Sequence, residues 1–203
     1  MFLWVKTLVL LLAFFTDLCL SQTTQFGHLP HNFTLAALNT TLPNANTTGA
    51  PLVLGQNGAS SGITFYVTST YASFPYNDYP ALGLVDNGLR AYSSTGRWIT
   101  NATAVTSGGT LGWISTTIYA HPAPQIYSVV RLPGYEYPLL AANGFHNLWS
   151  LCPFSGNRPQ TNIVFNVTAD VPPPPYLGFD PSLCYDVVIT MIPIEDHEDH
   201  EGW

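Results

Sequence analysis

The first pattern that suggests catalysis is a Gly-x-Ser-x-Gly motif at Gly58–Gly62, with Ser60 in the position of a nucleophile. In hydrolases such a serine sits on a strained turn between a buried strand and a helix. Here residues rich in Gly, Asn and Gln precede the motif, and an alternating apolar pattern beginning at Ile63 follows it. The sequence therefore predicts a plain turn at Ser60 and no catalytic serine.

A second candidate chemistry is hydrolysis of a glycosidic bond, which requires two carboxyl groups flanking that bond. The spacing of the carboxylates does not indicate which two would face each other. Asp86 and Asp180 lie in predicted turns, where aspartate bonds to the local backbone. No catalytic residue is predicted, and a secreted polysaccharide hydrolase with a carboxylate pair is kept as the alternative function. The carboxylates between residues 22 and 194 are Asp78, Asp86, Glu136, Asp170, Asp180 and Asp186.

A histidine-containing acidic segment at the C-terminus has the ligand types of a metal site. His197 and His200 stand among five carboxylates in residues 195–203. Ordering this segment costs about 1–2 kcal/mol per residue in backbone entropy, and it has few apolar side chains to bury in return. We therefore predict an acidic tail without a preformed metal site, and no pattern predicts a cofactor.

Aromatic residues are abundant, with eleven tyrosines and five tryptophans. Exposed rings in a row can stack on sugars, whereas packing in an apolar core is the commoner role of such rings. Both roles are open for the aromatic residues of the central part of the chain. These are Tyr66, Tyr71, Tyr76, Tyr79, Tyr92, Trp98, Trp113, Tyr119, Tyr127, Tyr135 and Tyr137.

The N-terminal residues have the features of a secretory signal. Lys6 precedes an apolar run over Leu8–Phe15, and the small residues Cys19 and Ser21 fit a cleavage site. The run is shorter than the ~20 apolar residues of a membrane span, and no later stretch approaches that length. We therefore predict a signal peptide over 1–21 and a secreted, extracellular protein.

Charged residues are scarce. The formal net charge is −7, and residues 22–194 contain four arginines and no lysine. A protein that binds nucleic acid neutralises phosphates with basic patches. The sequence therefore argues against a nucleic-acid partner.

Glycosylation signals are frequent behind the predicted leader. Three of the five Asn-x-Ser/Thr sequons fall within fifteen residues, in a region rich in Thr, Asn and Pro. We predict a glycosylated lead-in over 22–61, although the same composition also fits a plain flexible segment. The sequons begin at Asn32, Asn39, Asn46, Asn101 and Asn166.

The cysteines predict one disulfide bond. Cys19 lies in the predicted leader, so the mature chain keeps only Cys152 and Cys184. Two cysteines in an exported domain normally pair. The bond would lower the entropy of the unfolded chain by the equivalent of about 3–4 kcal/mol, and it requires Cα atoms within about 7 Å.

The elements that must position these groups are short strands. From Gly62 onward apolar residues alternate with polar ones, turn signals recur, and helical periodicity is absent. Asp86–Gly88 and His121–Pro124 are interpreted as hairpin loops. The strand over Tyr185–Ile194 is apolar on both faces and is expected to be central. The prediction is an all-β domain over 62–194, an antiparallel β-sandwich or barrel-like sandwich, followed by the tail at 195–203.

The segment Trp149–Pro153, with sequence Trp-Ser-Leu-Cys-Pro, and the late Cys184 resemble elements of small secreted fungal antigens, the cell-wall or IgE-binding-type β proteins. The stretch Gly83–Leu89 is similar to their unit of two short strands joined at Asn-Gly. The chain departs from them in lacking an early cysteine pair and in its histidine-acid tail. The resemblance implies a surface or secreted β protein and supplies no catalytic residues.

These observations favour a secreted, N-glycosylated surface or cell-wall-associated protein with a structural, adhesive or glycan-binding role. A hydrolase would need a cleft with two converging carboxylates, whereas a binding protein needs a grooved aromatic face. Cell-wall glycan is the expected partner. The sequence leaves the exact ligand and the oligomeric state open.

Overall fold

The structure, a computed structural model, describes residues 32–95, 99–156, 159–168 and 178–194. Nearly all regular structure in this part is strand, and one short 3₁₀ helix, η1 (Pro181–Leu183), is present. The predicted signal peptide at 1–21 and acidic tail at 195–203 lie outside the described residues.

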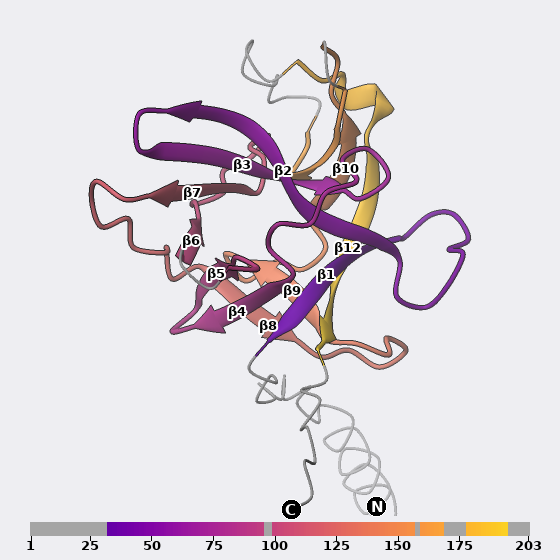
Figure 1. The fold of residues 1–203 in the computed structure, drawn as a ribbon. Coiled ribbons are helices and arrows are strands. Elements are labelled where there is room, and N and C mark those ends of the chain that lie inside the picture. The colour runs from indigo at the N-terminus through magenta and orange to yellow at the C-terminus, as the bar shows by residue number, and fades with distance from the viewer. Residues whose placement is uncertain (1–31, 96–98, 157–158, 169–177, 195–203) are drawn as a thin grey trace, which may run out of the picture.

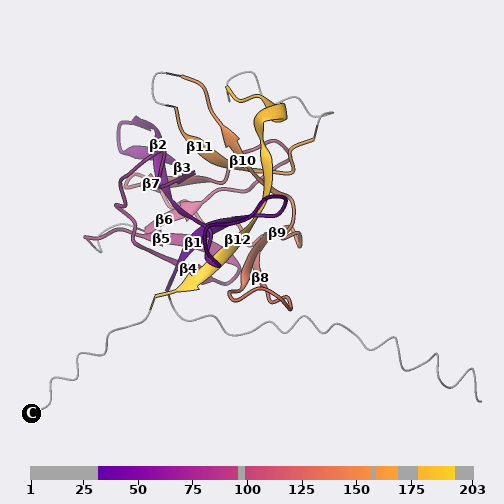
Figure 2. The ribbon, with the colours of Figure 1, turned by 90° about the vertical axis from the view of Figure 1, so that its right-hand side faces the viewer.

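Twelve strands form one antiparallel sheet (Figures 1 and 2). Short strands joined by turns follow from a sequence in which Gly, Pro and Asn interrupt every apolar run. The strands are β1 (Phe33–Asn39), β2 (Ala50–Ser60), β3 (Ile63–Thr70), β4 (Ala81–Val85), β5 (Gly88–Tyr92), β6 (Ile99–Ala102), β7 (Gly112–Thr116), β8 (Tyr127–Val130), β9 (Leu139–Ala142), β10 (Trp149–Pro153), β11 (Thr161–Phe165) and β12 (Tyr185–Pro193).

The sheet closes on itself as a nine-stranded barrel with additional strands. Neighbours around the barrel are β1, β4, β5, β6, β7, β3, β11, β10 and β12, and β12 pairs with β1 to complete the circle. Strand β2 pairs with both β1 and β3, and the β8–β9 hairpin joins β12. The predicted all-β antiparallel fold with one disulfide is therefore confirmed, in its closed, barrel form.

Large side chains fill the barrel interior. Trp113, Trp149 and Tyr127 are fully buried in one core with aliphatic residues from nearly every strand. All three residues satisfy their buried polar groups: Trp113 Nε1 donates to Thr68 Oγ1, Trp149 Nε1 donates to the carbonyl of Leu140, and the Tyr127 hydroxyl donates to the carbonyl of Thr103. These bonds satisfy the indole N–H and phenol O–H groups that burial would otherwise leave unpaired.

Strand β1 closes the barrel, which corrects the predicted domain boundary. It pairs with β12 over seven residues, from Phe33 opposite Pro193 to Asn39 opposite Val187. Phe33 is buried in the core. The prediction that the core begins at residue 62 was wrong, because the composition rich in Thr, Asn and Pro comes mainly from the loop between β1 and β2, whereas both strands contribute residues to the core.

The turn predictions had mixed outcomes. Asp86 and Asn87 adopt positive φ angles of 51° and 59° and join β4 to β5, as predicted. Strand β12 is central, because it pairs with β1, β10 and β9. The second predicted hairpin was wrong: the strands before and after His121–Pro124, β7 and β8, pair with other strands and not with each other. Ser60 ends β2 at the turn before β3, as expected for a turn serine.

Candidate functional site

An open groove of about 1180 Å³ runs between the β2–β3 hairpin and the segments that follow β10. Its lining combines amide side chains, hydroxyl groups and aromatic rings. Such a mixture of apolar surface with a few placed polar groups is typical of ligand sites. The lining residues are Gln56, Asn57, Gly58, Val67, Ser73, Phe74, Pro75, Tyr76, Asp78, Thr110, Phe154, Ser155, Pro159, Gln160, Asn162 and Gly178.

Two of the amide side chains are held in place by a buried serine. Ser69 on β3 lies opposite Asn162 on β11, and its hydroxyl lies 2.7 Å from Asn162 Oδ1 and 2.9 Å from Gln160 Oε1. Gln160 Nε2 also donates to the carbonyl of Gln56 across the groove. These bonds restrict the rotamers of both amides, so less side-chain entropy is lost when a ligand binds them.

Gly55 makes room for this arrangement. A Cβ atom at residue 55 would lie 2.1 Å from Gln160 Oε1 and 2.3 Å from Ser69 Oγ. Both distances are far below van der Waals contact. The absence of a side chain at Gly55 therefore allows Gln160 to reach Ser69 beneath the groove.

Aromatic rings stand beside the fixed amides. Phe74 and Tyr76 form an edge-to-face pair with ring centroids 5.1 Å apart. Tyr76 is 62% exposed, the largest exposed fraction of any Phe, Tyr or Trp side chain in the described part of the chain. Phe154, on the opposite wall, packs on Phe179 at 4.9 Å. An exposed ring beside hydrogen-bonding amides can pack against the C–H face of a sugar.

The disulfide bond supports the wall that carries Phe154. Cys152 and Cys184 are bonded with a Cα–Cα distance of 4.3 Å, which confirms the predicted pairing. Two residues beyond Cys152, Phe154 forms a β-bridge with Phe179, and Ser155 donates from its backbone and its hydroxyl to Gly178. The bond therefore joins the two segments that together form this wall.

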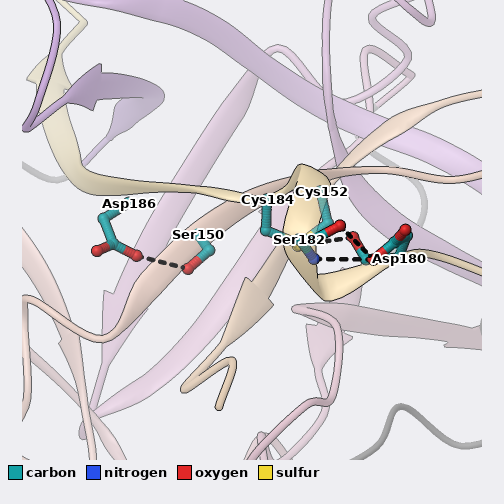
Figure 3. The surroundings of a disulfide bond; sticks show 6 residues. All are labelled: Ser150, Cys152, Asp180, Ser182, Cys184 and Asp186. Atoms are coloured by element: carbon teal, nitrogen blue, oxygen red, sulfur yellow. Dashed lines mark hydrogen bonds between the residues drawn. A yellow bond between two sulfur atoms is a disulfide. The ribbon is translucent and has the colours of Figure 1, made fainter. Parts of the chain in front are cut away.

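Polar contacts brace both sides of the disulfide (Figure 3). Ser150 Oγ donates to Asp186 at 3.1 Å, and the N–H and hydroxyl of Ser182 donate to Asp180, which caps η1. The bonds from Ser182 hold the pKa of the Asp180 carboxyl below its usual value. The carboxylates of Asp180 and Asp186 are therefore both engaged in structural hydrogen bonds.

The carboxylates considered for hydrolysis do not form a pair in the described part of the chain. Asp78 lines the groove, whereas Asp86 lines a different hollow beside the β4–β5 turn. Asp180 and Asp186 brace the disulfide, and Glu136 lies exposed in the loop before β9. The remaining candidate, Asp170, is outside the described residues.

The five sequons differ in how their amides are used. Asn39, the last residue of β1, and Asn46, in the loop that follows, each accept hydrogen bonds at Oδ1, including one from a threonine of the same sequon. Asn101 Nδ2 instead donates to the carbonyl of His121, and Asn166 Nδ2 donates to Ser107 Oγ. Asn32 is half-buried directly before β1. Glycan attachment requires Nδ2, so the sequons are not equivalent.

We expect glycopeptide mapping of the exported protein to find glycans at Asn39 and Asn46 and an unmodified Asn101. The first two amides leave Nδ2 without a partner among the described residues, whereas a glycan on Asn101 would displace the bond to His121. The Thr103→Ala variant, which removes the Asn101 sequon, is the control and should change the mass of the glycoprotein only by the difference between threonine and alanine, with no loss of glycan mass. A glycan at Asn101 would contradict this prediction.

Metal-binding and membrane-spanning features are absent from the described part of the chain. No group of three or more His, Cys, Asp or Glu side chains gathers there as a metal site. No helix among these residues has the length and apolar character to cross a membrane. His197 and His200 of the predicted tail are outside the described residues.

Comparisons of the chain with known protein families, with curated proteins and with solved structures find no match. The resemblance to fungal surface antigens therefore stays a prediction. The feature that indicates a function is the groove, and above all the exposed ring of Tyr76, which lines it together with the amides of Gln160 and Asn162.

Proposed function

We propose that the protein is a secreted, N-glycosylated surface protein that binds neutral glycan chains in this groove. The observation that carries the proposal is that the exposed Tyr76 ring lines the same groove as two amide side chains that contact the Ser69 hydroxyl. Sugars present hydroxyl groups that both donate and accept, and amides do the same. An aromatic ring supplies the apolar contact that a sugar's C–H face requires.

Charge supports a neutral ligand. Asp78 is the one charged residue among the described lining residues, so nothing in this lining attracts an anionic polymer. Polysaccharide of a cell wall, the partner expected from the sequence, has this chemistry.

Binding is favoured over hydrolysis by the supply of carboxylates. Both common mechanisms of glycoside hydrolysis use a pair of carboxyl groups about 5–10 Å apart. The described lining of the groove contains Asp78 alone. A glycan array followed by a hydrolysis assay on every glycan that binds tests the choice. Release of reducing ends that the Asp78→Asn variant abolishes would make the protein a hydrolase and overturn the proposal.

Replacing the exposed ring should weaken glycan binding without affecting the fold. We expect Tyr76→Ala to lower the affinity for the best array glycan about tenfold or more, because truncating a central aromatic contact commonly costs over 1.4 kcal/mol. Isothermal titration calorimetry measures the change. Tyr71→Ala is the matched control, because Tyr71 is 45% exposed and lies outside the groove lining. Equal losses in both variants would show that the groove is not the binding site.

A further inference from the structure

A second polar constellation lies on the outer surface of the barrel. Arg90 on β5, Asn101 on β6 and Ile114 on β7 are direct cross-strand neighbours. Their side chains point outward, because the adjacent residues Ala91 and Trp113 are buried in the core. One row across three strands therefore presents a guanidinium, an amide and an apolar side chain to the outside.

The segment between β7 and β8 folds back over this row. Asn101 Nδ2 donates to the carbonyl of His121. Ala123 packs closely on Gly88, because a Cβ atom added at residue 88 would lie 2.8 Å from the Cβ of Ala123. The segment and the strands border an open hollow of about 540 Å³, here called the side hollow. It is lined by Val85, Asp86, Arg90, Asn101, Ile114, Thr116, Tyr119, Ala120, His121, Pro122, Ala123 and Gln125.

Polar atoms without partners concentrate around the side hollow. Four buried side-chain polar atoms in the described part of the chain have no hydrogen-bond partner, and three of them belong to its lining residues: Arg90 Nε, Asn101 Oδ1 and His121 Nε2. Buried polar groups are nearly always paired, and an unpaired one destabilises the protein. Three such atoms around one hollow indicate a place for a molecule that the protein itself does not supply.

The donor and acceptor types define the chemistry of that molecule. Arg90 Nε–H requires an acceptor, Asn101 Oδ1 requires a donor, and His121 Nε2 can take either role according to its tautomer. A carboxylate or phosphate supplies acceptors only, so it leaves Asn101 Oδ1 without a donor, and the negative charge of Asp86 in the same lining offsets the positive charge of Arg90. Neighbouring hydroxyl groups supply both functions without charge.

We propose that the side hollow is a second saccharide site that takes a single neutral sugar residue. The three side chains are each partly exposed, so rotation can turn their polar atoms into the hollow. Tyr119, 49% exposed, provides an aromatic face at the rim. The site is separate from the groove and does not rest on the function proposed there.

The test uses the full mature protein and saturation-transfer NMR with free glucose, mannose, galactose and N-acetylglucosamine. At least one of these sugars should bind, and Arg90→Gln should weaken that binding about tenfold, since it removes a buried charged donor. Arg131→Gln, an exposed arginine outside the side hollow, is the matched control and should leave the affinity unchanged. Tyr76→Ala in the groove should also have no effect.

Several outcomes would overturn the proposal. Failure of all four sugars to bind would show that ordered water alone occupies the hollow. Stronger binding of glucuronate or inorganic phosphate than of any neutral sugar would make it an anion site. Loss of sugar binding in Tyr76→Ala but not in Arg90→Gln would assign the sugar to the groove. If Arg90→Gln fails to fold, Tyr119→Ala replaces it, with the same expected loss.

Discussion

The Trp149→Ala variant should lose about 3–5 kcal/mol of its free energy of unfolding, the range for truncating a large aromatic residue in a core. Trp149 has no exposed surface and packs edge-to-face on Phe165 with ring centroids 4.9 Å apart. Its indole N–H also donates to Leu140 in the β8–β9 hairpin at 2.9 Å. One substitution therefore removes core packing and the link between β10 and that hairpin. Urea unfolding followed by far-ultraviolet circular dichroism measures the loss.

Two further variants separate packing from hydrogen bonding. Trp149→Phe keeps most of the apolar contact but leaves the Leu140 carbonyl without its donor, so a smaller loss of about 1–3 kcal/mol is expected. Tyr71→Ala, at an exposed position, should stay within about 0.5 kcal/mol of the parent. A cost below about 1 kcal/mol for Trp149→Ala would contradict the central position of this ring.

Removing the disulfide should cost about 3–4 kcal/mol. Cys152 and Cys184 are 32 positions apart, and the bond restricts the unfolded chain accordingly. The double variant Cys152→Ala/Cys184→Ala avoids a free buried thiol, since Cys152 is fully buried. Because the bond holds the wall that carries Phe154, glycan affinity in the groove should also fall in the variant while it remains folded. Urea unfolding and calorimetry give the two quantities.

Ser182→Ala is the local control for the disulfide variant. It removes the hydroxyl bond to Asp180 in η1 but leaves the cysteines intact, and its position is exposed. We expect a change below about 1 kcal/mol, as for most exposed sites. If the double cysteine variant is as stable as Ser182→Ala, the bond has no role in the stability of the barrel.

Features encoded in short stretches of sequence were predictable. Asp and Asn tolerate the positive φ angles that Asp86 and Asn87 adopt. The β4–β5 hairpin could therefore be predicted from the tripeptide Asp86–Gly88 alone. An apolar run on both faces identified β12 as central. The pairing of Cys152 with Cys184 followed directly once Cys19 was assigned to the predicted leader.

Features that depend on long-range pairing were not predictable. The buried Ser69 meets Asn162 only because β3 and β11 are neighbours, and neither residue belongs to a motif. Ser69 stands between Thr68 and Thr70 in a polar end of β3, so its sequence neighbours gave no signal, whereas Asn162 before the apolar residues of β11 was a weak one. The loop at His121 was taken for a hairpin because its local composition fits one, whereas the barrel pairs β7 and β8 with other strands. The side hollow, which lies under that loop, was hidden for the same reason.

The pairing of β1 with β12 has a consequence for the order in which the protein acquires its structure. Thr190 on β12 donates to the carbonyl of Ala36 on β1 across 154 positions. Contacts of such sequence separation form slowly, because a long chain segment must be confined before they form. The barrel cannot close until β12 has been synthesised and has paired with β1. Circular permutants that join residues 32 and 194 bring these two strands close together in sequence and should therefore fold faster than the parent.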